Sequence, residues 1–173
     1  NDGTLFVTLG ERYALRDEAQ NPANHIGKVV HINADGTPAA GNPGGPGWAP
    51  EVWSIGHRNI QGAAIDPATG ELWTVEHGAK GGDELNKPEP GKNYGWPVIT
   101  YGVDYSGAKI GEGKEKAGLE PAVYYWVPSI ATSGLAFYTG DLFPDWKGNV
   151  FVGGLRGTQL QRLVMKDGAV TSA

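Results

Sequence analysis

The feature that most constrains the fold of this chain is a turn containing Asp and Gly that is followed, each time, by residues that favour β-strands. It occurs three times: at 2–3 before 5–7, at 66–70 before 72–75, and at 145–148 before 150–152. Recurrence of one unit along a chain indicates a repeat architecture. Short strands at this density, separated by loop insertions, favour an all-β fold of the β-propeller type. An irregular β-sandwich is the alternative that the pattern alone leaves open.

Strand-forming runs cover much of the chain, and no long helix is predicted. We expect strands at 4–9, 27–33, 52–55, 63–65, 72–75, 122–127, 134–138, 149–152 and 160–165. The one window of helical length, 13–23, lacks an apolar stripe, and the polar segment 11–25 is expected to be a surface loop. Blade faces of a propeller pack against neighbouring blades, so a partial ring should leave apolar strand residues exposed.

Composition excludes several classes of function. The chain has no Cys, which excludes disulfides, thiolate zinc sites and cysteine nucleophiles. A net charge of −5 without a run of Lys or Arg argues against nucleic acid as a partner. No apolar run approaches the ~20 residues of a membrane span. Because the sequence starts within a turn at Asn1 and stops after Val170 without a closing element, we expect 1–173 to be one partial propeller domain, truncated at both ends.

Polar side chains gather between residues 56 and 97. Gly-rich turns alternate there with short strands, and loops on a fixed scaffold are where binding residues concentrate. Arg58 stands between His57 and Asn59, with Gln61 close behind. A guanidinium flanked by amides suits a ligand with several carboxylates or a quinone. A structural Arg that ties two loops, beside a packed His57, explains the same spacing.

A second group of polar residues offers oxygen ligands. Calcium takes several carboxylate and backbone carbonyl oxygens on a flexible loop. The Gly-rich segment 78–82 could expose carbonyl groups, and Asp83, Glu84 and Asp104 could supply charge. A solvated acidic turn is the simpler explanation of these residues. Arg156, at the end of a predicted strand, is by position alone a surface residue more often than a ligand-binding one.

Most of the chain is covered by five motifs, in this order: GHRNIQG, EHGAKGGDELN, NYGWP, WVPSIATSGLAFYTG and FVGGLRG. Together they closely resemble the pyrroloquinoline quinone (PQQ)-dependent soluble aldose sugar dehydrogenases of the glucose/sorbosone dehydrogenase family. The resemblance implies a six-bladed β-propeller that oxidises the anomeric carbon of aldose sugars to lactones. It also implies PQQ and Ca²⁺ as cofactors, hydride transfer to the calcium-bound PQQ, an external electron acceptor, and a periplasmic or secreted location.

The same resemblance assigns roles to residues of this chain. The implied cofactor-binding residues are Arg58, Asn59, Gln61, Trp126, Ser129 and Arg156. The implied calcium residues are Gly78 and Ala79, through their backbone carbonyls, with Asp83, Glu84, Tyr94 and Asp104. Ala79 stands where the family has Pro, which matters little if only the carbonyl is used. We therefore expect Arg58 and Arg156 to converge over a metal held by the turn at Gly78 and Ala79.

Two departures from the family pattern affect the expected chemistry. The glucose dehydrogenase branch has a cofactor-binding lysine where this chain has Thr139. The catalytic His of the family precedes the strand that 4–9 matches, so the resemblance places the base upstream of Asn1. The four His of this chain, His25, His31, His57 and His77, do not match that place. We expect the chain to carry much of the cofactor site, with Arg58 assisting the reaction, but to be inactive alone.

Two other functions fit a propeller. A calcium-dependent lactonase-type hydrolase needs an open calcium and a carboxylate base, but it does not need Arg58 and Arg156. A non-catalytic binding module needs no cofactor, so PQQ would leave its melting temperature unchanged.

Overall fold

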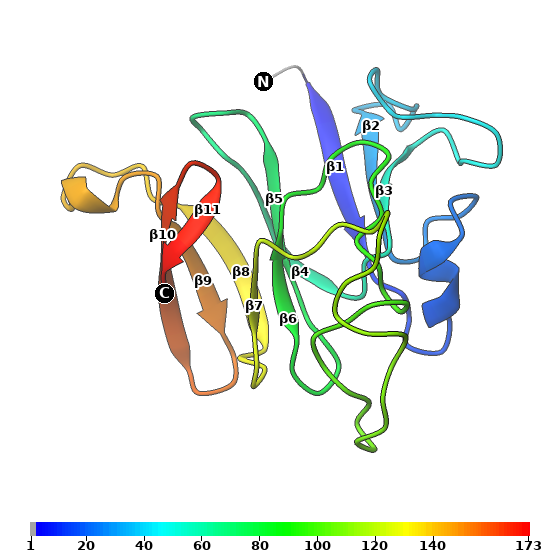
Figure 1. The fold of residues 1–173 in the computed structure, drawn as a ribbon. Helices are drawn as coiled ribbons and strands as arrows, with labels where there is room; N and C mark the ends of the chain where they lie inside the picture. The colour runs from blue at the N-terminus through cyan, green and yellow to red at the C-terminus, as the bar shows by residue number, and fades with distance from the viewer. Residues whose placement is uncertain (1–2) are drawn as a thin grey trace. The chain divides into compact units, whose positions relative to one another are not determined.

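The structure is a computed structural model that describes residues 3–173, and it consists almost entirely of β-strands (Figure 1). The strands are β1 (Thr4–Leu9), β2 (Lys28–Asn33), β3 (Val52–Ile55), β4 (Ile60–Ile65), β5 (Leu72–Glu76), β6 (Asp83–Asn86), β7 (Tyr124–Trp126), β8 (Thr132–Phe137), β9 (Val150–Gly154), β10 (Gln159–Lys166) and β11 (Ala169–Ser172). Two short 3-10 helices are η1 (Arg16–Gln20) and η2 (Pro144–Trp146). Three antiparallel sheets result, with the orders β1-β2-β3, β4-β5-β6-β7 and β8-β9-β10-β11.

The chain divides into two compact units. One unit contains the chain up to Ile60 together with Pro88–Thr100 and Ala108–Pro121. The other contains Gln61–Lys87, Tyr101–Gly107 and Ala122–Ala173. The prediction that 1–173 is a single partial domain stays a prediction.

The first unit is built on the sheet β1-β2-β3, in which β1 and β2 pair along their whole length from Thr4 opposite Asn33. Val30, Val52 and Ile55 form a small hydrophobic core. Burial alternates along most of β1, because successive side chains of a strand point to opposite faces. Apolar side chains of β1 are therefore exposed, as predicted for strands of a partial ring.

A buried cation fixes the connection between β1 and β2. Lys28 is fully buried, and its Nζ donates hydrogen bonds to the carbonyl oxygens of Glu18, Ala19 and Ile26. Burial lowers the pKa of Lys28 to about 8, and the charge of Glu18 opposes that shift. The prediction of a surface loop at 11–25 is wrong in part, since η1 forms there and Ala19 is buried.

The second unit contains two four-stranded sheets that share one core. The core residues, drawn from both sheets and from the loop before β8, are Trp73, Val75, Leu85, Trp126, Ile130, Val150, Val152 and Leu163. Strand β5 is buried along its whole length, as expected of a strand covered on both faces. Backbones come very close where Gly62 of β4 faces Gly134 of β8, since a Cβ on Gly62 would lie 2.9 Å from the Cα of Gly134.

All nine predicted strands are present, with ends that differ by a few residues. The turn-and-strand pattern at 66–75 and 145–152 leads into β5 and β9, which occupy the same second place in their sheets. This equivalence supports the predicted repeat. Within the described residues 3–173, η1 and η2 are the only helices, and none is long and apolar enough to span a membrane.

Two strands were not predicted. One of them is β11, which pairs with β10 after the last predicted strand. Strand β6 carries Asp83 and Glu84, which the sequence places in a Gly-rich turn. It forms because Leu85 is fully buried and because the strand pairs with β5 on one side and β7 on the other.

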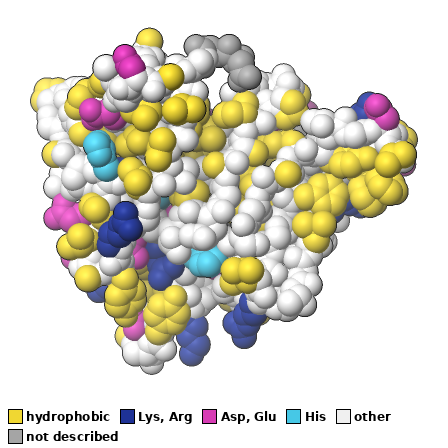
Figure 2. Space-filling model, turned by 180° about the vertical axis from the view of Figure 1, so that it is seen from behind, with side chains coloured by type: hydrophobic (Ala, Val, Ile, Leu, Met, Phe, Trp, Pro, Cys, Tyr) yellow, Lys and Arg dark blue, Asp and Glu magenta, His cyan; other side chains and the backbone are white. Residues whose placement is uncertain are grey.

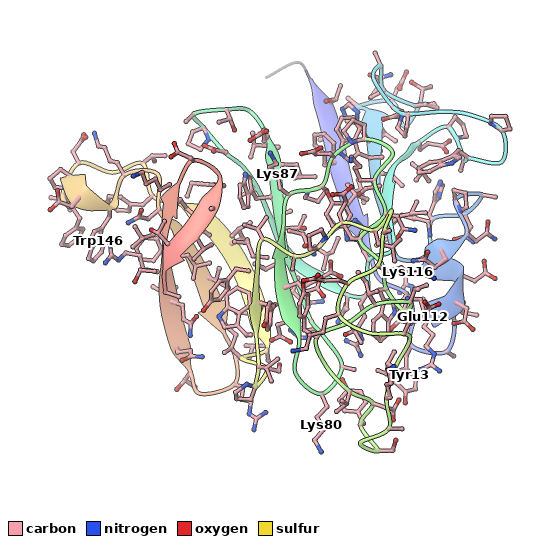
Figure 3. All side chains as sticks on the ribbon, viewed as in Figure 1. Tyr13, Lys80, Lys87, Glu112, Lys116 and Trp146 are labelled. Carbon is pink, nitrogen blue, oxygen red and sulfur yellow. The ribbon has the colours of Figure 1, made fainter. Side chains whose placement is uncertain are left out.

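An exposed apolar loop joins β8 to β9. Leu142 and Phe143 are exposed there, and the ring of Phe143 stacks on Trp146 with centroids 4.2 Å apart. Figure 2 shows hydrophobic side chains gathered on this loop, and Figure 3 labels Trp146 within it.

Candidate functional site

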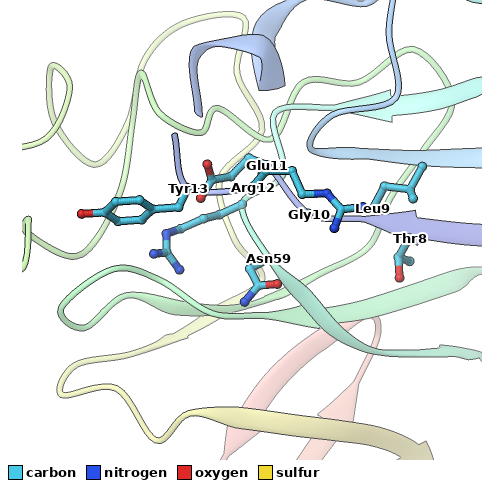
Figure 4. Close-up of a pocket in the computed structure, with 8 residues that line it drawn as sticks. Thr8, Leu9, Gly10, Glu11, Arg12, Tyr13 and Asn59 are labelled. Atoms are coloured by element: carbon cyan, nitrogen blue, oxygen red, sulfur yellow. The ribbon is translucent and has the colours of Figure 1, made fainter. Parts of the chain in front are cut away.

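A cavity of about 450 Å³ opens in the first unit at the carboxyl end of β1 (Figure 4). It is lined by Thr8, Leu9, Gly10, Glu11, Arg12, Tyr13, Arg58 and Asn59. Two of the predicted cofactor-binding residues, Arg58 and Asn59, therefore share one cavity. They lie in the short connection between β3 and β4, where strands on both sides fix the backbone.

Arg58 is held in place on two sides. It is only 7% exposed, and its Cζ lies 5.1 Å from the centroid of the Trp96 ring. A guanidinium over an indole face gains cation–π stabilisation. Its carbonyl oxygen accepts a hydrogen bond from the backbone N–H of Glu11 (2.9 Å), which ties the two walls of the cavity together. A desolvated guanidinium in this position suits an anionic ligand.

His57, next to Arg58, is a packed residue, as one interpretation of the sequence held. It is fully buried, and its Nε2 lies 2.8 Å from the Oγ of Ser54. Its ring stacks on Tyr94 at a centroid distance of 4.9 Å. The hydroxyl of Tyr94 accepts a hydrogen bond from the backbone N–H of Glu89. The predicted role of Tyr94 in a structural calcium site stays a prediction.

Glu11 is a site residue that the sequence analysis missed. It is buried in the cavity wall, and its Oε2 has no hydrogen-bond partner among the described residues. Burial raises the pKa of the Glu11 carboxyl, while the nearby charge of Arg58 opposes the shift. The sequence signal for Glu11 was its position. It follows the predicted strand 4–9 and Gly10, and loops at strand ends often carry binding residues.

The rim of the cavity carries backbone strain. Arg12 and Tyr13 have φ of 62° and 59°, in the left-handed region that side chains other than Gly rarely adopt. Such strain clusters at functional sites. Both side chains are exposed, and Figure 4 shows them at the cavity, directly after Glu11 in the chain. Neither residue was singled out from the sequence.

In the second unit, the turn after β5 brings backbone carbonyl groups together. A Cβ on Gly78 would lie 2.2 Å from the carbonyl oxygen of Gly81 and 2.3 Å from that of Gly82. Gly82 also needs its φ of 76°, and a Cβ there would lie 2.5 Å from the N of Gly102. Only glycine permits this packing. Figure 3 shows the side chain of Lys80 projecting from the turn.

Asp83 is fully buried at the start of β6, and protein donors surround both of its oxygens. Its Oδ1 accepts a hydrogen bond from the N–H of Gly78 (3.0 Å). Its Oδ2 accepts hydrogen bonds from Ser129 Oγ (2.8 Å) and from the N–H groups of Ile130 (3.0 Å) and Ala131 (2.8 Å). The carboxylate therefore joins the Gly78 turn to the loop before β8.

Glu84 faces Glu76 across the pair β5-β6. The Nδ2 of the buried Asn86 donates to both carboxylates, at 2.9 Å to Glu76 Oε1 and 3.0 Å to Glu84 Oε2. Burial raises the pKa of Glu84 to about 8, repulsion from Glu76 and Asp83 adds to the shift, and the Asn86 hydrogen bond opposes it. A cation near these carboxylates would reduce their repulsion.

Several predicted residues of the second unit lie close to one another. The N–H of Arg156 donates to the carbonyl of Ile130, so the exposed β9-β10 turn adjoins the Ser129 loop. The N–H of Gly82 donates to the carbonyl of Trp126. The Asp104 loop contacts the same turn, since Val103 and Lys80 form an antiparallel bridge. Neighbouring loops thus carry Gly78, Ser129, Arg156 and Asp104, and Asp83 lies beside them at the start of β6.

The predicted convergence of Arg58 with Arg156 stays a prediction. Arg58, Asn59 and Tyr94 belong to the first unit, and the other predicted site residues, Gln61 among them, belong to the second. Gln61 is exposed on β4. No group of three or more His, Asp or Glu side chains within 3–173 could hold a metal. The predicted calcium contacts at Gly78 and Ala79 use backbone carbonyls instead and stay a prediction.

Comparisons with known proteins agree with this architecture. The chain is 46% identical over 158 residues to aldose sugar dehydrogenase YliI of Escherichia coli, which covers 89% of this chain and 42% of YliI. The apo-form crystal structure of the soluble aldose sugar dehydrogenase from Escherichia coli is 42% identical, with a TM-score of 0.92. The match covers 98% of this chain and 50% of the Escherichia coli chain. The PQQ-bound form of aldose sugar dehydrogenase from Streptomyces coelicolor is 34% identical, with a TM-score of 0.77. The match covers 98% of this chain and 44% of the Streptomyces coelicolor chain.

The sheets and these matches define the chain as part of a β-propeller. The family model described as Glucose / Sorbosone dehydrogenase matches residues 1–173. The chain belongs to the glucose/sorbosone dehydrogenase family. It spans less than half the length of the curated relatives that it matches.

Proposed function

We propose that the protein to which this chain belongs oxidises the anomeric carbon of aldose sugars to lactones, with PQQ and Ca²⁺ as cofactors and an external electron acceptor. The observation that carries the proposal is the buried guanidinium of Arg58 beside Asn59 in one cavity wall. PQQ presents carboxylates and quinone oxygens, which require charged and amide donors. The PQQ-bound relative from Streptomyces coelicolor supports the same cofactor.

The residues present fit both cofactors. For calcium, the close packing of Gly78 against Gly81 and Gly82 brings backbone carbonyl groups of this turn together, and carbonyl oxygen is a hard ligand that this ion takes. The carboxylates of Glu76 and Glu84 repel one another nearby. For PQQ, the cavity of about 450 Å³ is within the range of small-molecule sites and offers a charged donor at Arg58.

When bound, PQQ supplies an acceptor for two electrons and Ca²⁺ supplies a Lewis acid for its quinone oxygen. Arg58 binds and orients the carboxylate or quinone oxygens, and Asn59 donates its amide hydrogens to the same ligand. Gly78 and Ala79 offer carbonyl oxygens to the metal. Arg156 supplies a second guanidinium for a carboxylate. Thr139 is exposed after β8 and has no charge to replace the family's lysine.

Binding of PQQ to the native state must raise the melting temperature. At a concentration of ~100 times the dissociation constant, the gain is about 2.7 kcal/mol, or about 5–10 °C for a chain of this length. We expect this shift to require calcium and to be reduced in Arg58→Gln. The matched control is Arg162→Gln, which removes a partly exposed guanidinium that lies over Trp146 instead. An unchanged melting temperature with both cofactors present would overturn the proposal. Reduction of an artificial dye by aldoses in the full-length protein tests the activity itself.

A further inference from the structure

Asp83 accepts hydrogen bonds from two separate segments of the chain. It is fully buried, and four protein groups donate to its two oxygens at 2.8–3.0 Å. Hydrogen bonds to an ionised group are shorter and stronger than neutral ones. Oδ2 accepts three of these hydrogen bonds and Oδ1 accepts one, so the carboxylate binds two protein segments at once.

The segments that Asp83 joins are the ones that carry the predicted cofactor contacts. Its Oδ1 holds the N–H of Gly78, whose carbonyl is a predicted calcium ligand. Its Oδ2 holds the loop of Ser129, a predicted cofactor residue. Through Ile130, whose carbonyl accepts from the N–H of Arg156, the same loop also fixes the β9-β10 turn.

The loop that Asp83 holds is strained. Ala131 has a φ of 53°, in the left-handed region that is unfavourable for a residue with a side chain. The Ala131 N–H points at Asp83 in this conformation, and its carbonyl accepts a hydrogen bond from Leu155. Without the carboxylate, the loop would lose three of its hydrogen bonds, and the Ala131 N–H would keep only the longer one to Ser129 Oγ (3.1 Å).

We propose that Asp83 is a positioning residue that couples the calcium-binding turn at Gly78 to the Ser129–Ala131 loop, so that calcium and PQQ are bound by one rigid assembly. This inference rests on the proposed function. Asp83 acts through the backbone groups that it orients and touches neither cofactor. A carboxylate that serves stability alone would lower the melting temperature when replaced, without changing the affinity for calcium.

The test compares Asp83→Asn with a control of similar burial. The amide of Asn cannot accept from donors on both sides. With PQQ saturating, we expect the calcium concentration at half-maximal thermal shift to rise by about tenfold or more, as for other residues that orient metal ligands. Leu72→Ala is the control, because Leu72 is buried at the opposite end of β5. Its melting temperature should fall, and its calcium midpoint should stay at the wild-type value.

The outcomes separate the two claims. If the wild-type protein shows no shift with PQQ and calcium, the proposed function fails and this inference fails with it. If the wild type shifts and Asp83→Asn has the same calcium midpoint, the proposed function stands and the coupling is refuted.

A measurement on the wild type decides the matter if Asp83→Asn does not fold. Calcium should slow hydrogen exchange of the Ile130 and Ala131 amides as well as that of Gly78, because Asp83 links them. Slower exchange at Gly78 with unchanged exchange at Ile130 and Ala131 would overturn the coupling.

Discussion

The close approach of Gly62 to Gly134 gives a sharp test of how the two sheets of the second unit pack. A Cβ on Gly62 would lie 2.7 Å from the N of Leu135 and 2.8 Å from the carbonyl carbon of Gly134. Ordinary van der Waals contact begins at 3.4 Å, so Gly62→Ala must push backbone apart. No flexible side chain is present to move aside.

The cost of this substitution follows from two opposing effects. Overpacking of a close contact destabilises by about 1–3 kcal/mol. Replacing Gly in an ordinary extended conformation gains about 0.4–1 kcal/mol, because the unfolded chain loses freedom. The net loss for Gly62→Ala is about 1–2 kcal/mol, which corresponds to a fall of about 2–8 °C in the melting temperature.

Urea unfolding followed by far-UV circular dichroism, with calorimetry beside it, measures this loss. The matched control is Gly134→Ala, from the other side of the same contact. A Cβ on Gly134 would meet nothing within 4 Å, so this variant should be as stable as the wild type or slightly more stable. If Gly62→Ala keeps the wild-type midpoint, the two strands do not approach as described and the packing argument is refuted.

Three further predictions concern single residues. Lys28→Met removes the donor to three carbonyls and should destabilise by about 2–4 kcal/mol, measured by urea unfolding; a smaller change than about 1 kcal/mol would show that water replaces the ammonium. The pKa of Glu11 is raised above 4.5, so its protonated form contributes stability that is complete below pH 4.5 and is lost as pH rises through the higher, folded-state pKa. Glu11→Gln should therefore flatten the dependence of the unfolding free energy on pH above 4.5, and a parallel curve would contradict the assignment. A Cβ at Gly78 would clash with the carbonyls of Gly81 and Gly82, so Gly78→Ala should distort the turn and raise the calcium midpoint of the thermal shift with PQQ, and a wild-type midpoint would exclude this turn from the calcium site.

Most strands could be predicted because their own residues and the turns directly before them favour the strand conformation. Runs such as 4–9 and 72–75 combine β-branched and aromatic residues with a preceding Asp and Gly turn. Strand β6 lacks these marks, since three of its four residues are polar and Leu85 is its one apolar residue. Its strand conformation depends on pairing with β5 and with β7, a partner about forty residues away in the sequence.

The candidate site was predicted in part for a related reason. Arg58 and Asn59 stand out because charged and amide side chains follow a predicted strand, and the structure places both in one cavity. Glu11 escaped notice because its burial comes from tertiary packing against the Arg58 segment, which periodicity does not reveal. Arg12 and Tyr13 escaped notice because their left-handed backbone is not encoded by a Gly.

The role of Asp83 could not be predicted from the sequence. An Asp in a Gly-rich segment has the same appearance in sequence whether it binds calcium or accepts protein hydrogen bonds. The two cases differ in how many N–H and O–H groups come within reach, and three of the four donors here lie 46–48 positions away. Because Asp83 accepts four protein hydrogen bonds, we expect calcium in this turn to depend mainly on backbone carbonyls, with Glu84 as the neighbouring carboxylate. The affinity for calcium should then depend on the backbone geometry of Gly78 more than on the number of acidic side chains nearby.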